Sequence, residues 1–206
     1  MEMDRFTEKA LAALHSAQET AVRMGHQQVD GEHIHYALSV QQDGLIPKLL
    51  GYMGKDTALY VKDLENELNK LPRIQGSSVS DVYATRRMSE ILIRAQDEAK
   101  RFKDDYAGVE HLYLALLKER GTPSASIFKR HGITVENFMA ALSKVRGGQR
   151  VTSQNPEGTY DSLNRYGRDL VELAKQGKID PVIGRDAEIR RAIRILSRRT
   201  KHNPVL

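Results

Sequence analysis

Apolar residues recur at helical spacing along most of the first 146 residues. Behind Asp4, a candidate N-cap, such a stripe comprises Phe6, Ala10, Ala13, Leu14, Ala17 and Ala21. A second stripe follows Thr85 and comprises Met88, Ile91, Leu92, Ala95, Ala99 and Phe102. Intervals of three and four residues place these side chains on one face of an α-helix, so each stripe predicts a long amphipathic helix.

Three shorter helices are predicted after each long one. Asp30 is placed to cap the first of them, and the stretches 44–53 and 122–131 give the next pair. Gly54 and Gly132 follow where a left-handed residue commonly ends a helix. The last pair covers about 56–70 and about 134–146. Neither half alternates apolar and polar residues, so the predicted fold is all-α with eight helices.

The two halves are copies of one another at an offset of 78 residues. Residues about 4–72 and 82–148 form the repeats, joined by a loop over 71–84. Two copies favour a closed pseudo-twofold domain, since solenoids normally need three or more units. Grooves between the halves are expected. The identical positions include Leu14, Ala17, Gln18, Ala21, Glu32, His33 and Leu64, which recur as Leu92, Ala95, Gln96, Ala99, Glu110, His111 and Leu142.

The composition changes after Arg146. Residues 149–159 are mostly polar, follow two glycines and include Pro156 and Gly158, which predicts a flexible linker. An amphipathic helix ending before Gly177 and a second helix after Gly184 follow, and Val205 begins an apolar, strand-like end. Two helices and a short strand cannot bury a core by themselves. We therefore expect residues 160–206 to be the incomplete start of a second, α/β domain, with 1–148 as the first.

Charge and composition exclude several classes of function. Residues 1–148 carry 20 basic and 20 acidic side chains, so the net charge of +5 arises entirely after them. A neutral surface with interleaved charges is poor material for binding nucleic acid. Cysteine is absent, and neither an apolar leader nor a membrane-spanning run is found, which predicts a cytoplasmic protein without a membrane partner.

Candidate catalytic and metal-binding residues are few. His33 and His35 stand beside Glu32, but the repeat keeps only Glu110 and His111 and no further cluster completes a zinc site. A structural role at the start of a short helix is the favoured interpretation. Hydrolase motifs are lacking, so no catalytic residue and no metal ligand is predicted.

The residues from 179 to 206 closely resemble the start of the first AAA+ module of the Clp/HSP100 unfoldases, and the duplicated domain resembles the Clp N-terminal domain. Within that family, residues 3–7, Leu71–Pro72, 160–163 and 166–170 point to the disaggregase branch. The resemblance implies an ATP-driven, Mg-dependent, heat-shock chaperone that forms a homohexamer and threads aggregated polypeptides through its ring. It also implies a DnaK-type partner, engaged through a middle coiled-coil domain that lies outside this sequence.

The resemblance assigns two sets of binding residues. Thr7, Asp104 and Glu110 match positions implicated in binding unfolded polypeptides, and the adenine-lining positions match Val182, Ile183, Gly184 and Arg185. The strand at Val205 leads, in the family, into the phosphate loop. Because the sequence stops before that loop, this polypeptide alone is predicted to be no enzyme, to bind nucleotide weakly and to stay a monomer.

Two other interpretations remain open. An adaptor-docking domain of a ClpA- or ClpC-like unfoldase that serves a protease has the same fold, and a free-standing helical scaffold is the third hypothesis. A neutral groove with adaptable apolar walls suits weak binding of many clients. Arg94 and Glu98, however, place charges on a helix where a fully apolar groove wall is expected.

Overall fold

The computed structural model of the chain describes residues 3–74, 82–146, 150–156, 170–175, 177–179 and 184–198. It divides into two compact units, 1–161 and 162–206. The eight predicted helices are present in the first unit, which confirms the all-α class. They are α1 (Glu8–Met24), α2 (Gly31–Val40), α3 (Leu45–Tyr52), α4 (Thr57–Asn69), α5 (Arg86–Phe102), α6 (Val109–Leu117), α7 (Pro123–Arg130) and α8 (Val135–Arg146).

The helix starts follow from side chains that accept hydrogen bonds from otherwise unpaired backbone amides. Thr7 Oγ1 accepts from the Ala10 amide at 3.3 Å, and Thr85 Oγ1 accepts from the Met88 amide at 3.0 Å. The prediction that Asp4 caps the first helix is therefore wrong. Asp4 lies in a 3₁₀ turn, Met3–Arg5, because the next residues are held in extended form by the other repeat.

The two repeats exchange their leading segments. Phe6 forms a parallel bridge with Ala107, and the short strands β1 (Gln28–Val29) and β2 (Tyr83–Ala84) pair in parallel, with Val29 opposite Ala84. These two contacts are the same contact at the 78-residue offset. The segment before the long helix of each repeat thus pairs with the loop before the second helix of the other, as the pseudo-twofold arrangement requires.

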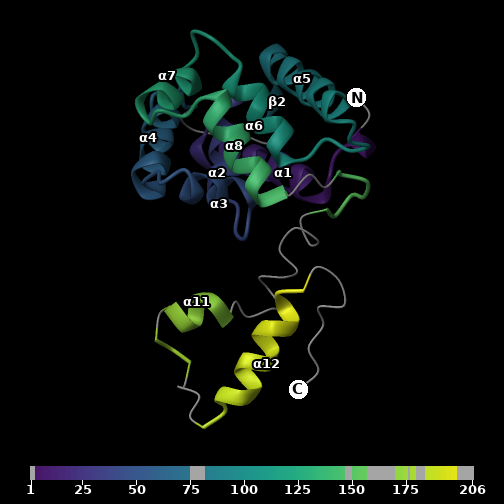
Figure 1. The fold of residues 1–206 in the computed structure, drawn as a ribbon. Coiled ribbons are helices and arrows are strands. Elements are labelled where there is room, and N and C mark those ends of the chain that lie inside the picture. The colour runs from purple at the N-terminus through teal and green to yellow at the C-terminus, as the bar shows by residue number, and fades with distance from the viewer. Residues whose placement is uncertain are drawn as a thin grey trace. The chain divides into compact units, whose positions relative to one another are not determined.

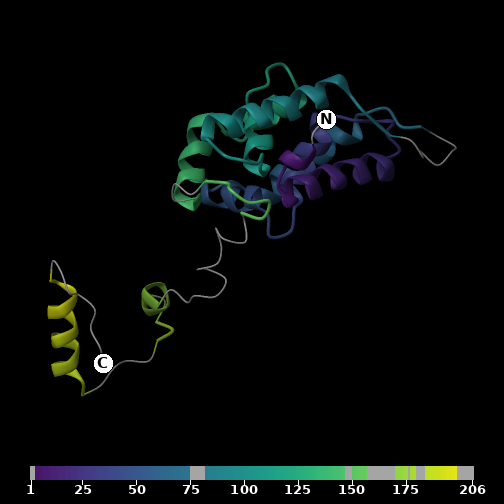
Figure 2. The same ribbon diagram turned by 90° about the vertical axis from the view of Figure 1, so that its right-hand side faces the viewer.

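The core lies between the repeats and is centred on α2 and α6. Figure 1 shows α6 near the middle of this unit, and Figure 2 shows α1 and α5 along opposite sides of it. Small side chains along α1 let its neighbour approach closely, since Ala10, Ala13, Ala17 and Ala21 are all buried. Every residue of α6 from Val109 to Leu116 is buried, which makes it a helix surrounded by protein on all sides.

A buried ionic cluster joins the repeats at Glu32. Both of its carboxylate oxygens accept from the guanidinium of Arg87, at 2.8 and 2.9 Å, and Oε1 also accepts from Ser124 Oγ at 3.2 Å. Arg87 further donates to Glu119 at 2.8 Å. An added Cβ at Gly31 would lie 2.6 Å from that guanidinium, so a larger residue there would displace Arg87 from its present position. One carboxylate thereby connects α2 to α5 and α7.

A neighbouring network of neutral groups crosses the same interface. His35 Nε2 lies 2.5 Å from Tyr60 Oη, which in turn lies 2.8 Å from Tyr113 Oη. His35 Nδ1 is 3.0 Å from Ser124 Oγ. Burial lowers the pKa of His35 to about 3, so the ring is neutral at physiological pH.

The segment after α8 is packed, although residues 149–159 were expected to be a flexible linker. Among the described residues 150–156, Val151 is fully buried, and its carbonyl accepts from the Asp105 amide at 2.9 Å. The carbonyl of Gln154 accepts from the Glu8 amide at 2.8 Å. Since these bonds use backbone atoms, the polar composition carried no sign of them. We call residues 150–156 the return strap.

The second unit contains α11 (Leu170–Lys175) and α12 (Asp186–Leu196). Gly177 adopts φ 66°, as expected of a residue that ends a helix, and Gly184 precedes α12 with φ 78°. The apolar residues Ile189, Ile193 and Leu196 of α12 are exposed. The predicted helical residues before 170 and the strand beginning at Val205 lie outside the described residues. Within the described ranges, no helix carries an apolar run that would reach across a bilayer.

Gly25 and Lys103 are equivalent positions that end α1 and α5 with φ 75° and 59°. A residue with a side chain is destabilised by roughly 1–2 kcal/mol in this left-handed conformation. Glycine avoids that strain but loses more conformational entropy on folding, which offsets part of the difference. We expect Lys103→Gly to raise the free energy of unfolding by about 0.5 kcal/mol and Gly25→Ala to lower it by about 1 kcal/mol. Urea denaturation measures both, and a destabilised Lys103→Gly variant would contradict the strain.

Glu32→Gln removes one charge of the buried pair, and we expect it to lower the free energy of unfolding by about 3 kcal/mol at pH 7. Burial acts to raise the pKa of Glu32, but the hydrogen bonds and charge of Arg87 outweigh it and hold the pKa below its ordinary value of 4.5. The stabilisation is therefore complete above that value and is lost as the pH falls through the lowered pKa.

Denaturation curves at pH 7 and at pH 3 measure this dependence. The difference between the native chain and Glu32→Gln is large at pH 7 and shrinks in acid. A difference that stayed constant over this range would show that the carboxylate charge contributes nothing.

Candidate functional site

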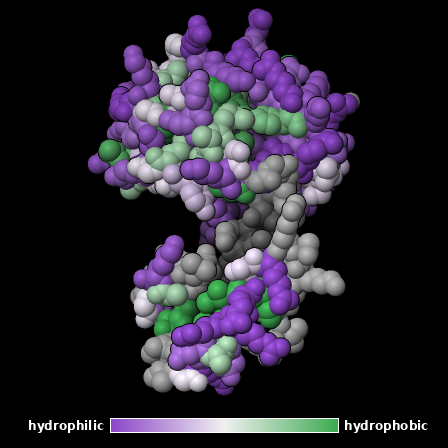
Figure 3. Space-filling model, in the orientation of Figure 1, coloured by the Kyte–Doolittle hydropathy of each residue, from purple (hydrophilic) through white to green (hydrophobic). Residues whose placement is uncertain are grey.

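A groove lies on the second repeat, between α5, α6 and α8. Its cavity has a volume of about 230 Å³ and an apolar lining of Phe102, Leu114, Val135 and Met139. Figure 3 shows hydrophobic side chains gathered over α6 and α8 within a hydrophilic surround. Grooves were expected between the halves of the domain, whereas this one is built by helices of one half alone.

The rim of this groove is charged but internally paired. Glu98 Oε1 lies 2.8 Å from Arg101 and 2.7 Å from Lys118, which cancels most of its charge. Glu98 is thus the charge that the sequence placed on the groove wall. Arg94 instead pairs with Glu90 at 3.6 Å and does not line the cavity. The groove therefore offers an apolar floor within a rim whose one carboxylate pairs with two cations, which leaves a net charge of +1.

Asp104 and Glu110 lie in a buried cluster behind this groove. The carboxylate of Asp104 accepts from Arg146 at 2.5 Å and from the Val151 amide at 2.9 Å, and it lies 3.1 Å from His111 Nε2. Glu110 Oε1 is 3.7 Å from the same guanidinium. The side chains of Asp104 and Glu110 are 0% and 1% exposed, so a bound polypeptide could not contact them directly in this conformation.

Burial acts to raise the pKa of Asp104, but hydrogen bonds from His111 and Arg146 and from the Val151 amide outweigh it and keep the pKa below its ordinary value. The carboxylate is ionised at neutral pH. Its negative charge is what holds the guanidinium in the interior.

The cluster touches the groove through Phe102. The guanidinium of Arg146 lies 5.7 Å from the centre of the Phe102 ring, and the His111 ring centre lies 5.3 Å from it. Phe102 is also part of the groove lining. The position of this aromatic wall therefore depends on the charged groups behind it.

Thr7 belongs to the same end of the domain but not to the cluster. It is fully buried, caps α1, and its amide donates to the Ala107 carbonyl at 3.1 Å. Ala107 lies in the loop between Asp104 and α6. The structure thus brings the three residues assigned by resemblance to one region, where each contacts other parts of the domain.

Two residues of this region were not foreseen from the sequence, Arg146 and Val151. Arg146 occupies the position that Leu68 holds in the first repeat. When an arginine stands at a position where the other repeat has an apolar residue, a new charge partner for that arginine is indicated. A position-by-position comparison of the repeats could therefore have identified Arg146. Val151 had no such signal, since it lies in a segment without helical periodicity.

His33 and His35 have structural partners, as the sequence suggested. His33 Nδ1 accepts from the Asp30 amide at 3.1 Å at the start of α2, and His35 joins the buried tyrosine network. Within the described ranges, no group of three or more His, Asp or Glu side chains is arranged to hold a metal ion.

The four adenine positions are only partly described. Val182 and Ile183 lie outside the described residues, whereas Gly184 and Arg185 are exposed. These two residues do not by themselves enclose a base.

Comparison with known proteins places this fold in a family. The family model of the Clp repeat N-terminal domain matches residues 5–131. The chain is 50% identical over 209 residues to the chaperone protein ClpB of Nitratidesulfovibrio vulgaris and 47% identical over 208 residues to that of Clostridium tetani. Each match covers 100% of this chain and 24% of the relative, so the chain spans about a quarter of those proteins.

A solved structure has the same fold. The N-terminal domain of Hsp104 from Candida albicans matches with a TM-score of 0.65 at 23% identity, over 74% of this chain and 98% of that one. The chain therefore belongs to the family of Clp repeat N-terminal domains and is similar over its whole length to the N-terminal region of ClpB chaperones.

Proposed function

We propose that this chain recruits client proteins for a ClpB-type disaggregase by binding exposed apolar segments of unfolded or aggregated polypeptides in the groove of α5, α6 and α8. The observation that carries the proposal is the apolar floor of that groove within a rim whose charges pair with one another. Such a surface selects for apolar side chains without demanding a particular sequence, and modest affinity allows the client to be released to the ring.

Asp104 and Glu110 act in this proposal as positioning residues. They hold the Arg146 guanidinium against Phe102 and so fix one wall of the groove. Thr7 acts less directly, because its amide is hydrogen-bonded to Ala107 and so connects the start of α1 to the loop that contains Asp104. This role reconciles their assignment to client binding with their burial.

The activities of the whole protein are part of the same proposal. A ClpB-type chaperone hydrolyses ATP with Mg²⁺ in a cytoplasmic homohexamer and cooperates with a DnaK-type chaperone through its middle domain. Val182, Ile183, Gly184 and Arg185 would contribute to an adenine site that needs more of the AAA+ module. Support comes from the similarity to ClpB over the full length of this chain.

The groove is tested by the double variant Val135→Thr/Met139→Gln, which keeps the side-chain shapes and adds polar atoms to the floor. We expect its affinity for a fluorescently labelled, permanently unfolded casein to fall about thirtyfold or more, because burying each of the two apolar side chains contributes on the order of 1–2 kcal/mol. Fluorescence anisotropy with the full chain measures the binding.

The matched control is Val22→Thr/Leu59→Gln, which alters two exposed apolar residues of the first repeat, 43% and 51% exposed. Its affinity should equal that of the native chain. Equal losses in both double variants would place binding outside the groove. No saturable binding by the native chain at all would favour the adaptor-docking alternative.

The positioning role is tested by Asp104→Asn, which keeps the shape of the side chain and removes its charge. We expect casein binding to weaken about threefold at a temperature where circular dichroism shows the variant to be folded, since one wall of the groove loses its support. Glu32→Gln is the control, because it also breaks a buried ion pair but lies away from the groove. If both variants weaken binding equally, the effect is a general loss of stability.

A further inference from the structure

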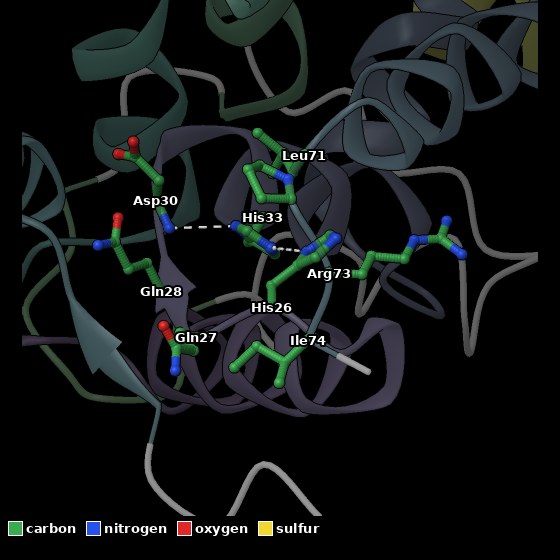
Figure 4. Close-up of a pocket in the computed structure, with 9 residues that line it drawn as sticks. His26, Gln27, Gln28, Asp30, His33, Leu71, Arg73 and Ile74 are labelled. Carbon is green, nitrogen blue, oxygen red and sulfur yellow. Dashed lines mark hydrogen bonds between the residues drawn. The ribbon is translucent and has the colours of Figure 1, made fainter. Parts of the chain in front are cut away.

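A second cavity, in the first repeat, is lined differently from the groove of α5, α6 and α8. It has a volume of about 240 Å³, room for about eight water molecules, and lies between the start of α2 and the residues that follow α4. Figure 4 shows polar residues on one side of it and the 71–74 segment on the other. The lining comprises His26, Gln27, Gln28, Asp30, His33, Leu71, Pro72, Arg73 and Ile74.

A chain of hydrogen bonds fixes which nitrogen of each histidine carries a proton. The Asp30 amide can only donate, so His33 Nδ1, at 3.1 Å, must accept. Burial lowers the pKa of His33 to about 4, so the neutral ring carries its proton on Nε2. That nitrogen lies 2.9 Å from His26 Nδ1 and donates to it. His26, whose pKa is lowered by burial and by the charge of Arg73, therefore carries its own proton on Nε2.

The Nε2–H group of His26 is a buried donor with no acceptor among the described residues. The residue is 2% exposed, lines the cavity, and its Nε2 has no hydrogen-bond partner among the described residues. A ligand that offers a negatively charged acceptor to this donor replaces water there and forms a charge-assisted hydrogen bond, which is stronger than a neutral one. Figure 4 shows this nitrogen on the side of the ring away from His33.

The charges around the cavity favour an anion. Arg73 stands at the rim, where its guanidinium donates to Asn69 Oδ1 and retains further donors. The one carboxylate of the lining, on Asp30, is already engaged with the Gly31 amide and Thr85 Oγ1, each at 2.8 Å. It also lies 3.5 Å from Arg87. Its negative charge is thus compensated by partners outside the cavity.

The second repeat shows what occupies the corresponding place there. Asp104 stands at the position of His26, and the cation it binds, Arg146, stands at the position of Leu68. The second repeat therefore supplies both the carboxylate, Asp104, and the cation that it binds, Arg146. The first repeat supplies only the donors, His26 and Arg73, and keeps a cavity beside them.

We propose that this cavity is a binding site for a small aliphatic carboxylate, with the anion held by His26 and Arg73 and the apolar part against Leu71, Pro72 and Ile74. The carboxylate comes either from a free short-chain acid or from the C-terminal residue of a polypeptide, since both present the same group. This site shares no lining residue with the groove of α5, α6 and α8 and does not depend on the function proposed for that groove.

The test uses isovalerate as the free acid, N-acetyl-leucine as the chain end, and isovaleramide as a neutral probe of the same shape, each titrated into the full chain and followed by ¹H–¹⁵N NMR. We expect saturable shifts of the Gln27, Gln28 and Ile74 amides with the two acids. The amide should bind about tenfold more weakly, as expected when charge-assisted hydrogen bonds are lost. Tighter binding of N-acetyl-leucine than of isovalerate assigns the site to chain ends, and the reverse order assigns it to free acids.

Two variants and one direct observation complete the test. His26→Phe keeps a ring without the donor, Arg73→Gln removes the cation, and each should weaken isovalerate binding about fivefold or more. Arg130→Gln, an exposed arginine on α7, should leave it unchanged. Histidine ¹⁵N shifts of the free protein should show the Nε2–H form of His26. An Nδ1–H form, equal binding of acid and amide, or unchanged affinity in Arg73→Gln overturns the proposal.

Discussion

The exchange of leading segments between the two repeats is the constraint on which the rest of the domain depends. Neither repeat can complete itself, because the residue before each long helix is paired with a loop of the other copy, Phe6 with Ala107 and Ala84 with Val29. Each pairing fixes the entry of one long helix relative to the second helix of the other repeat. The core between α2 and α6, the Glu32 cluster and the tyrosine network all join the two repeats, so they depend on the relative position of the repeats that these two pairings fix.

Within that frame the repeats have kept their backbone and changed their chemistry. Equivalent caps start α1 and α5, and equivalent left-handed residues end them. The charged positions differ: Arg87 stands where the first repeat has Lys9, and Arg146 stands where it has Leu68. In each case an arginine of the second repeat binds a buried carboxylate. Both cavities differ because of this divergence. The groove of the second repeat lies in front of the Arg146 cluster, and the cavity beside His26 lies in the repeat that has Leu68 in place of that arginine.

Sequence patterns predicted what depends on neighbours in the chain. Helical spacing gave the eight helices, and the 78-residue offset gave their pseudo-twofold arrangement, because both are recorded in the order of residues. The sequence predicted Asp4 as the cap of α1, whereas the structure has Thr7. Both residue types cap helices, and only the bridge at Phe6 decides between them.

The candidate site was less predictable for the same reason. Resemblance brought out Thr7, Asp104 and Glu110, but it gave no indication that all three are buried, with Asp104 and Glu110 behind the groove wall. Periodicity identified Phe102 as an inward-facing residue without showing that it meets Arg146. The packing of Val151 was missed altogether, because a segment held by backbone hydrogen bonds needs no characteristic side chains.

The return strap also brings the two ends of the domain close together, which affects how readily the domain can be moved between proteins during evolution. Since Gln154 is hydrogen-bonded to Glu8, the polypeptide enters and leaves this fold at adjacent points. A module with neighbouring ends can be removed, duplicated or transplanted onto another protein while the ends of its host stay close together. Adjacent ends thus allow this domain to be joined to another protein without any change in its own interior.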